Sequence, residues 1–344
     1  MEPLSAAAWD PPPGWARLVT IESHTGGEPF RLFLSGVGEL PGSTVLEKRR
    51  HAIERLDHIR RATILEPRGH ADMYGGWIAP PVRPDSDLSV LFVHNEGFST
   101  MCGHGIIALA KVAIETAIVP ATGDVVELRI DTPAGQVVTR STRVDGVVVE
   151  TRFRNVPSFL SAADEEVDVP GLGTVGYDLA FGGAFYAFVD ATTLPIDPGD
   201  VTGLIEAGRA IKREVASTGK PIHPTEPDLE FLYGVIFTTP SSREGVHSRH
   251  VCVFADGEVD RSPTGTGVSG RLAILHHKGE VSIGEELGFE SIVGSRFSGE
   301  VVGVTDFHGM AAVIPEVGGT AHITGRSEWW IDPDDAIGAG FLLR

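Results

Sequence analysis

Two stretches decide the fold of this chain: Met101-Cys-Gly-His-Gly105 and Asp260-Arg-Ser-Pro-Thr-Gly-Thr-Gly267. Each places a glycine-rich turn directly before an apolar run of helical character, at residues 105–117 and 267–277. Each run then leads into a similar turn, Asp131-Thr-Pro-Ala-Gly135 in the first half and Glu290-Ser-Ile-Val-Gly294 in the second. This repetition predicts two related lobes, each presenting a glycine-rich turn at the start of a helix.

The rest of the chain is rich in short strands. β-branched and apolar runs bounded by Gly, Pro or Asp predict strands at residues 88–93, 125–130, 146–151, 232–238, 251–254 and 301–304. Further helices are expected at residues 45–60 and 201–215. Because strands outnumber helices, we expect an α+β arrangement and not a doubly wound sheet. The acidic, loop-like stretch at residues 157–168 predicts the boundary between the lobes.

Composition narrows the class of function. The net charge of −19 argues against nucleic-acid binding, which needs a basic surface. No run of eighteen apolar residues is present, so no membrane span is expected, and residues 1–17 are interpreted as a flexible leader and not a signal peptide. Two cysteines cannot form a disulfide framework and indicate a reducing cytoplasm. Because the chain carries a net charge of −19, an anionic substrate would need a locally positive pocket.

Cys102 is the candidate reactive group. Gly103 and Gly105 allow the backbone to approach a ligand closely, and a helix starting here would point its free N–H groups at that ligand. The same N–H groups would favour a thiolate on Cys102, since helix N-termini can lower a thiol pKa from ~8.5 to ~3.5–7.5. By contrast, Cys252 lies within an apolar run and is interpreted as a buried structural residue.

The second turn has no reactive thiol, because Thr264 occupies the position that corresponds to Cys102. Gly265 and Gly267 open the backbone at the helix start, and two such turns facing each other would form a nest of N–H groups for a carboxylate. No Lys follows the glycines as in a phosphate-binding loop, and the G-x-G-x-x-G spacing of dinucleotide sites is missing. Taken alone, this segment could equally be an ordinary capped helix start.

Several motifs, in order along the chain, carry a resemblance to a known family. They are His24-Thr-Gly-Gly-Glu-Pro29, Glu66-Pro-Arg-Gly-His-Ala-Asp72, Met101-Cys-Gly-His-Gly105, Asp131-Thr-Pro-Ala-Gly135, Phe181-Gly-Gly-Ala-Phe-Tyr186, Val253-Phe-Ala-Asp-Gly257, Asp260-Arg-Ser-Pro-Thr-Gly-Thr-Gly267 and Pro315-Glu-Val-Gly-Gly-Thr320. Together they resemble the proline racemase family over residues 24–325.

The resemblance implies two pseudo-symmetric lobes, each a mixed or antiparallel sheet wrapped around a central helix, with the ligand sealed between them. We expect residues 18–160 plus 328–344 to form the lobe that carries Cys102, and residues 165–327 the lobe that carries Thr264. The family needs no cofactor, and no metal is expected because no cluster has metal-ligand spacing. The expected partner is a small hydroxyproline-like substrate, and a homodimer is compatible with the sequence.

The departure at Thr264 distinguishes between members of the family. Racemases and 4-hydroxyproline 2-epimerases place an acid–base group on each face of the substrate carbon, and a threonine hydroxyl is too weak an acid for this role. A cysteine paired with a threonine resembles the branch that dehydrates trans-3-hydroxy-L-proline to Δ1-pyrroline-2-carboxylate. The alternatives are a 4-hydroxyproline 2-epimerase, a proline racemase or a non-catalytic amino-acid-binding protein.

We expect the site residues to have separate roles. Cys102 is expected to act as the base, with Thr264 on the opposite face, and the backbone N–H groups of Gly103, His104, Gly265 and Thr266 are expected to surround the carboxylate. The resemblance implies that Asp260 and the His104 side chain contact the ring ammonium.

Overall fold

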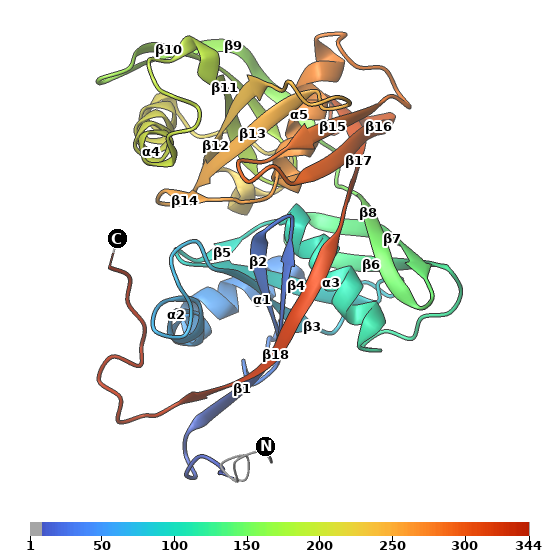
Figure 1. Cartoon of the computed structure of the whole chain (residues 1–344), viewed down its shortest axis with the longest axis vertical. Coiled ribbons are helices and arrows are strands. Elements are labelled where there is room, and N and C mark those ends of the chain that lie inside the picture. The colour runs from blue at the N-terminus through green and yellow to red at the C-terminus, as the bar shows by residue number, and fades with distance from the viewer. Residues whose placement is uncertain (1–8, 344) are drawn as a thin grey trace.

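Strand pairing divides the chain into two lobes that lie one above the other in the computed structural model, which describes residues 9–343 (Figure 1). The first lobe contains β1 (Ala16–Thr25), β2 (Glu28–Ser35), β3 (Tyr74–Ala79), β4 (Leu88–His94), β5 (Phe98–Ser99), β6 (Val125–Thr132), β7 (Gly135–Val144), β8 (Val147–Arg154) and β18 (Ala321–Ile331). Its helices are α1 (Val45–His51), which continues through a π-helical turn (Ala52–Leu56) into α2 (Asp57–Ile64), and α3 (Gly103–Glu115).

The second lobe repeats this arrangement. Its strands are β9 (Phe159–Val169), β10 (Gly173–Phe181), β11 (Phe185–Asp190), β12 (Leu232–Pro240), β13 (Ser248–Phe254), β14 (Glu258–Val259), β15 (Glu286–Glu290), β16 (Arg296–Phe307) and β17 (Met310–Gly319). Its helices are α4 (Val201–Thr218) and α5 (Gly265–His277), with short 3-10 turns at Ala191–Thr193 and Pro227–Leu229.

The two sheets have the same strand order. Neighbours run β18-β1-β2-β3-β4-β6-β7-β8 in the first lobe and β9-β10-β11-β12-β13-β15-β16-β17 in the second. The parallel pairs also match, β2–β3 with β11–β12 and β4–β6 with β13–β15. A parallel pair needs a crossover connection, and helices occupy each of these crossovers. The expected α+β fold of two pseudo-symmetric lobes is confirmed.

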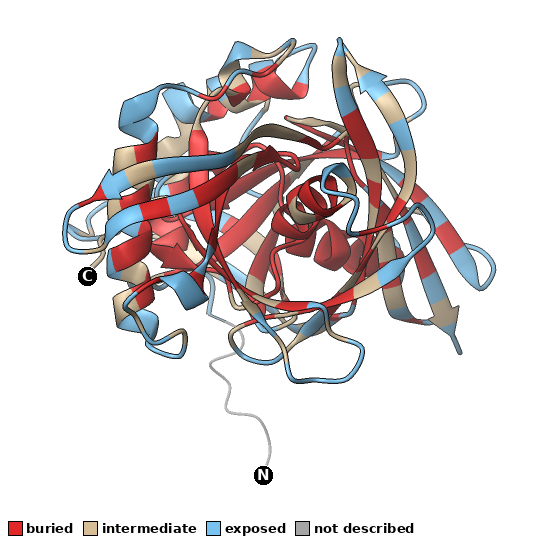
Figure 2. Ribbon diagram, turned by 90° about the horizontal axis from the view of Figure 1, so that it is seen from above, coloured by how far each residue is buried: buried red, intermediate tan, exposed pale blue. Residues whose placement is uncertain are grey.

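A buried helix lies at the centre of each sheet. Residues 103–114 of α3 are all buried, as an Ala- and Ile-rich helix that is apolar on every side requires. Seen from above, the curved strands surround this buried interior (Figure 2). The side chain of Lys111 carries a charge within this helix. Its Nζ donates to Glu115 Oε1 at 2.7 Å and to the Val148 carbonyl at 2.6 Å, which satisfies the buried ammonium group.

The chain crosses between the lobes near its C-terminal end. β17 pairs with β8 of the first lobe from Glu316 to Gly319, and the chain then continues into β18 (Figure 1). Because β18 pairs with β1 along its whole length, we propose that the chain re-enters the first lobe at Ala321, earlier than the expected residue 328. For the same reason we propose that the second lobe begins with β9.

The predicted leader lies only partly within the described residues. Residues 1–8 fall outside them, and β1 already begins at Ala16. Between these points the Trp9 ring packs edge-on against Trp330 of β18, with ring centroids 5.1 Å apart.

The N-termini of α3 and α5 meet at the interface of the lobes. A Cβ atom added to Gly103 would lie 2.5 Å from the Cα of Gly265, and one added to Gly265 would lie 2.8 Å from the Cα of Gly103. The Phe153 ring of β8 packs against both positions. Glycine is therefore required at both helix starts by close approach of the backbones.

We expect Gly103→Ala to lower the free energy of unfolding by about 1–3 kcal/mol, because the added methyl group overpacks this contact. Gly325→Ala is the matched control, since a Cβ there meets nothing within 4 Å. Urea-induced unfolding of both variants measures the difference, and equal stability of the two would contradict a tight helix-to-helix contact.

Candidate active site

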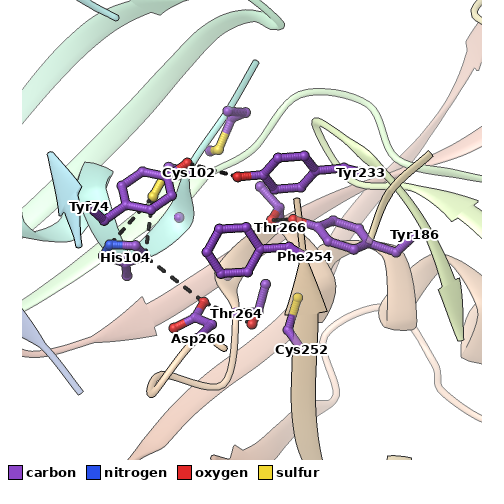
Figure 3. Close-up of a pocket in the computed structure, with 13 residues that line it drawn as sticks. Tyr74, Cys102, His104, Tyr186, Tyr233, Cys252, Phe254, Asp260, Thr264 and Thr266 are labelled. Atoms are coloured by element: carbon purple, nitrogen blue, oxygen red, sulfur yellow. Dashed lines mark hydrogen bonds and ion pairs between the residues drawn. The ribbon is translucent and has the colours of Figure 1, made fainter. Parts of the chain in front are cut away.

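A small cavity lies where the two helix N-termini meet. Its volume is about 20 Å³, which is room for about one water molecule. All seven residues predicted from the sequence line it: Cys102, Gly103, His104, Asp260, Thr264, Gly265 and Thr266 (Figure 3). The first three belong to one lobe and the other four to the second, so the site exists only when the lobes are together.

Cys102 is the N-terminal capping residue of α3. Its backbone is extended, with φ −146° and ψ 108°, and its Sγ accepts a hydrogen bond from the Gly105 N–H at 3.2 Å. The same sulfur lies 3.2 Å from Nδ1 of His104 (Figure 3). The capping bond therefore fixes the thiol at the positive end of the helix dipole, with its sulfur in the cavity.

The expected lowering of the Cys102 pKa is wrong for the pocket without a ligand. Burial raises the pKa of the Cys102 thiol well above its usual value, and the carboxylates of Asp260 and Glu28 raise it further. The Gly105 N–H and the nearby Tyr74 hydroxyl act in the opposite direction but do not outweigh burial. Desolvation of the charged form thus outweighs the helix terminus, which the sequence could not show.

His104 lies between the thiol and a carboxylate. Its Nδ1 is 4.0 Å from Oδ2 of Asp260, which comes from the opposite lobe (Figure 3). Burial lowers the pKa of His104, although Asp260 and a hydrogen bond with the Pro29 carbonyl oppose the shift. His104 is therefore held as a neutral imidazole, and its backbone carbonyl is fixed by the Thr25 hydroxyl at 2.9 Å.

Asp260 and Thr264 form the other side of the cavity. The Thr264 hydroxyl donates to Oδ2 of Asp260 at 2.9 Å, and the Ser262 N–H donates to Oδ1 at 2.7 Å. Thr264 precedes α5 with a φ of 65°, a left-handed conformation that is unusual for a β-branched residue. Its hydroxyl is thus engaged by the carboxylate and does not cap the helix.

The loop that carries Asp260 is held by the first lobe. The Arg261 N–H donates to Oε2 of Glu28 at 2.7 Å, and Nη2 of Arg261 donates to Oδ2 of Asp72 at 3.0 Å. Glu28 is completely buried, and burial together with Asp260 raises its pKa well above the usual range. These contacts explain why two motifs far upstream in sequence accompany the Asp260 motif.

Positive backbone groups converge on the cavity. The first N–H groups of a helix have no partner within the helix, and the helix dipole adds partial positive charge there. Both α3 and α5 begin at the cavity, so Gly103, His104, Gly265 and Thr266 all contribute first-turn backbone there. This arrangement suits a carboxylate even though the chain carries a net charge of −19.

A cluster of tyrosines completes the lining. The hydroxyls of Tyr74 and Tyr233 lie 3.3 Å apart beside Cys102 (Figure 3). Tyr74 also hydrogen-bonds to the Ser99 hydroxyl. Tyr186 bonds to Oγ1 of Thr266 at 2.8 Å on the other side. Burial raises the pKa of all three tyrosines well above the usual value, so they remain neutral hydroxyl groups.

Sequence reasoning did not assign five of the lining residues to the site: Tyr74, Met101, Tyr233, Cys252 and Phe254. Cys252 was interpreted as a buried structural residue; it is buried, and it also lines the cavity beside Thr264 (Figure 3). Burial and Asp260 raise the pKa of Cys252 well above its usual value, so it is a neutral thiol. The alternation of strand residues placed Cys252 and Phe254 on one face of β13, but nothing in the sequence showed which face meets the cavity.

Comparison with known proteins agrees with this geometry. The proline racemase family model matches residues 20–342, and the chain belongs to that family. A trans-3-hydroxy-L-proline dehydratase from Colwellia psychrerythraea is 47% identical over 94% of this chain and 92% of its own length. A 3-hydroxyproline 2-epimerase from Burkholderia multivorans is 45% identical over 95% of this chain and 98% of its own.

A solved structure gives the same result for the fold. A hydroxyproline epimerase from Agrobacterium vitis, with bound trans-4-hydroxy-L-proline, superposes with a TM-score of 0.91 at 29% identity and 96% coverage of both chains. Across residues 9–343, no group of three or more His, Cys, Asp or Glu side chains is placed to hold a metal ion. None of the helices in the described part of the chain is long and apolar enough to cross a membrane.

The raised pKa predicts how Cys102 reacts without a ligand. Iodoacetamide reacts with the thiolate, so its rate at Cys102 is expected to keep rising with pH above about 8.5, the pKa of a free thiol. Asp260→Asn removes a carboxylate that raises the pKa and should shift the profile to lower pH. Peptide mapping by mass spectrometry separates Cys102 from Cys252, and a rate that is already constant at neutral pH would contradict the raised pKa.

Proposed function

We propose that this protein is a hydro-lyase that dehydrates trans-3-hydroxy-L-proline to Δ1-pyrroline-2-carboxylate, with Cys102 as the base. The observation that carries the proposal is the asymmetry of the cavity: a thiol at the start of α3 faces a threonine at the start of α5. Such a site can remove a proton from one face of the substrate carbon only.

Binding follows from the charges around the cavity. The substrate carboxylate binds the first-turn N–H groups of Gly103, His104, Gly265 and Thr266, where the two helix dipoles converge. The ring ammonium binds Asp260 and His104, which lie 4.0 Å apart across the lobe interface. A cation placed there also offsets the carboxylates that raise the Cys102 pKa and so favours the thiolate when substrate is bound.

The stereochemistry of the substrate fits a single base. In trans-3-hydroxy-L-proline the hydroxyl and the carboxylate lie on opposite ring faces, so the α-hydrogen and the hydroxyl share a face. The Cys102 thiolate removes the α-proton, the 3-hydroxyl leaves as water, and the resulting enamine tautomerises to the product. The departing hydroxyl must also take up a proton, and the candidate donors are the new thiol, a water molecule beside it or a neighbouring acid.

Thr264 contacts the opposite face without acting as a base. Its hydroxyl already donates to Asp260 at 2.9 Å, and an alcohol is too weak an acid to exchange a proton near neutral pH. A reducing cytoplasm is the proposed location, since the reaction depends on a free thiol.

The names of the relatives support dehydration and also define the second candidate. Several relatives at 44–47% identity are named trans-3-hydroxy-L-proline dehydratase, whereas one at 45% is named 3-hydroxyproline 2-epimerase and one at 41% 4-hydroxyproline 2-epimerase. Incubation in heavy water with trans-3-hydroxy-L-proline, 4-hydroxyproline and L-proline distinguishes them. Dehydration consumes only the first compound, whereas epimerisation or racemisation inverts the α-carbon and incorporates deuterium there.

Cys102→Ser should abolish formation of Δ1-pyrroline-2-carboxylate, because a serine hydroxyl cannot act as the base near neutral pH. Product is measured by its reaction with o-aminobenzaldehyde, and retained binding of pyrrole-2-carboxylate, a planar mimic of the deprotonated ring, shows that the variant is folded. Near-normal dehydration by this variant would disprove the mechanism. Alkylation of Cys102 in the parental protein should be slowed by the same mimic.

Thr264→Cys should introduce inversion of the α-carbon of L-proline or 4-hydroxyproline, because it supplies an acid–base group on the second face. Thr264→Ser is the matched control, since it retains a hydroxyl and adds no thiol. Chiral chromatography of products formed in heavy water measures the inversion. Inversion by the parental protein at a comparable rate would favour the epimerase instead.

A further inference from the structure

The proposed dehydration requires an acid that the Cys102 thiolate alone does not provide. Hydroxide is a poor leaving group, so loss of the 3-hydroxyl needs a proton donor in the transition state. That hydroxyl leaves on the face from which the α-proton is removed, which is the face of Cys102. The donor must therefore lie beside Cys102, hold a proton at neutral pH and reach the cavity.

We propose that the Tyr74 hydroxyl is the general acid that protonates the departing 3-hydroxyl, an inference that rests on the proposed function. Tyr74 is the first residue of β3 and enters the cavity from the lobe that carries Cys102. Its hydroxyl lines the same cavity as the Cys102 thiol and lies 3.3 Å from the Tyr233 hydroxyl (Figure 3). It thus lies where a group leaving on the Cys102 face would meet it.

The surroundings of Tyr74 hold its ring in place. Its ring stacks on His94 with centroids 5.6 Å apart and meets His104 edge-on at 4.9 Å. The residue is 3% exposed, so bulk water does not compete for its hydroxyl. An acid in a fixed position of this kind needs no rearrangement at the moment of reaction.

Two neighbouring hydroxyls can stabilise the oxygen that Tyr74 leaves behind. Ser99 and Tyr233 both hydrogen-bond to it, and each can donate to a phenolate once the proton has gone. Burial raises the pKa of Tyr74, so the phenol stays protonated until a stronger base, the departing oxygen, draws the proton. In this way the residue acts only when the bond to the leaving group breaks.

The step balances within the site. The bond between the α-carbon and its hydrogen breaks toward Cys102 Sγ, its electron pair forms the bond between carbons 2 and 3, and the bond from carbon 3 to oxygen breaks. The oxygen takes the Tyr74 proton and leaves as water. The new Cys102 thiol then returns its proton to the Tyr74 phenolate, which restores both residues without an external reactant.

Other groups around the cavity fit this role less well. His104 is close to the thiol, but burial lowers its pKa and leaves it as a neutral imidazole. Thr264 is bound to Asp260 on the opposite face, and Tyr186 is bound to Thr266 there. The proton on the new Cys102 thiol has just come from the α-carbon. If that thiol were also the acid, the same sulfur atom would have to act first as base and then as acid.

The test compares two leaving groups in Tyr74→Phe. Water loss from trans-3-hydroxy-L-proline should fall in kcat by about 10²–10⁴-fold, the usual contribution of a general acid. Fluoride release from trans-3-fluoro-L-proline should stay within a few-fold of the parental rate, because fluoride leaves without a full proton transfer. Tyr177→Phe is the matched control, since Tyr177 is buried in a separate cluster of the second lobe and should keep both rates.

An equal fall of both rates would assign Tyr74 a positioning role, and unchanged water loss would overturn any role as acid. If Tyr74→Phe does not fold, Tyr233→Phe and Ser99→Ala replace it, because removing a donor to the phenolate should slow water loss more than fluoride release. Equal slowing in those variants would also overturn the proposal. If the parental protein consumes no trans-3-hydroxy-L-proline, the proposed function fails; if it dehydrates this compound and Tyr74→Phe does so at the same rate, only the role of Tyr74 fails.

Discussion

The approach of two helix N-termini, backbone to backbone, is the contact on which the rest of the molecule depends. Gly103 and Gly265 meet so closely that neither has room for a Cβ. To reach this contact, each lobe must wrap its sheet around a helix that is buried on every side, and each must leave the start of that helix uncovered. The cavity is the small space that remains beside the contact, lined by the residues on either side of the two glycines.

Burial of this contact sets two electrostatic effects against each other. Two helix dipoles direct positive ends at one cavity, which favours a carboxylate there in a protein of net charge −19. The same burial removes water from the Cys102 thiol and leaves the carboxylates of Asp260 and Glu28 nearby, so its pKa rises. In the proposed mechanism a cationic substrate would offset these carboxylates and favour the thiolate, so activation of the base would be coupled to binding.

The duplicated fold carries an unequal pair of functional groups. Strand order and parallel pairing are the same in both lobes, yet the position that holds a thiol in one holds an alcohol bound to a carboxylate in the other. The tyrosines are also unequal, since the hydroxyls of Tyr74 and Tyr233 gather at Cys102 and Tyr186 turns to Thr266. Because the two lobes have the same fold but only one supplies a thiol at the helix start, the site favours elimination of a leaving group over inversion of the substrate α-carbon.

The sequence by itself determined the features that depend on local chemistry. Glycine spacing before apolar runs predicted both helix starts, the repeat predicted two lobes, and the contrast of Cys102 with Thr264 predicted one-sided chemistry. Only the tertiary structure decided what depends on distant neighbours. Strand pairing brought Tyr74, Tyr233 and Cys252 into the cavity, and the closeness of the lobes reversed the expected pKa shift of Cys102. Desolvation and strand register arise from segments far apart in the chain, so no local pattern of residues could reveal them.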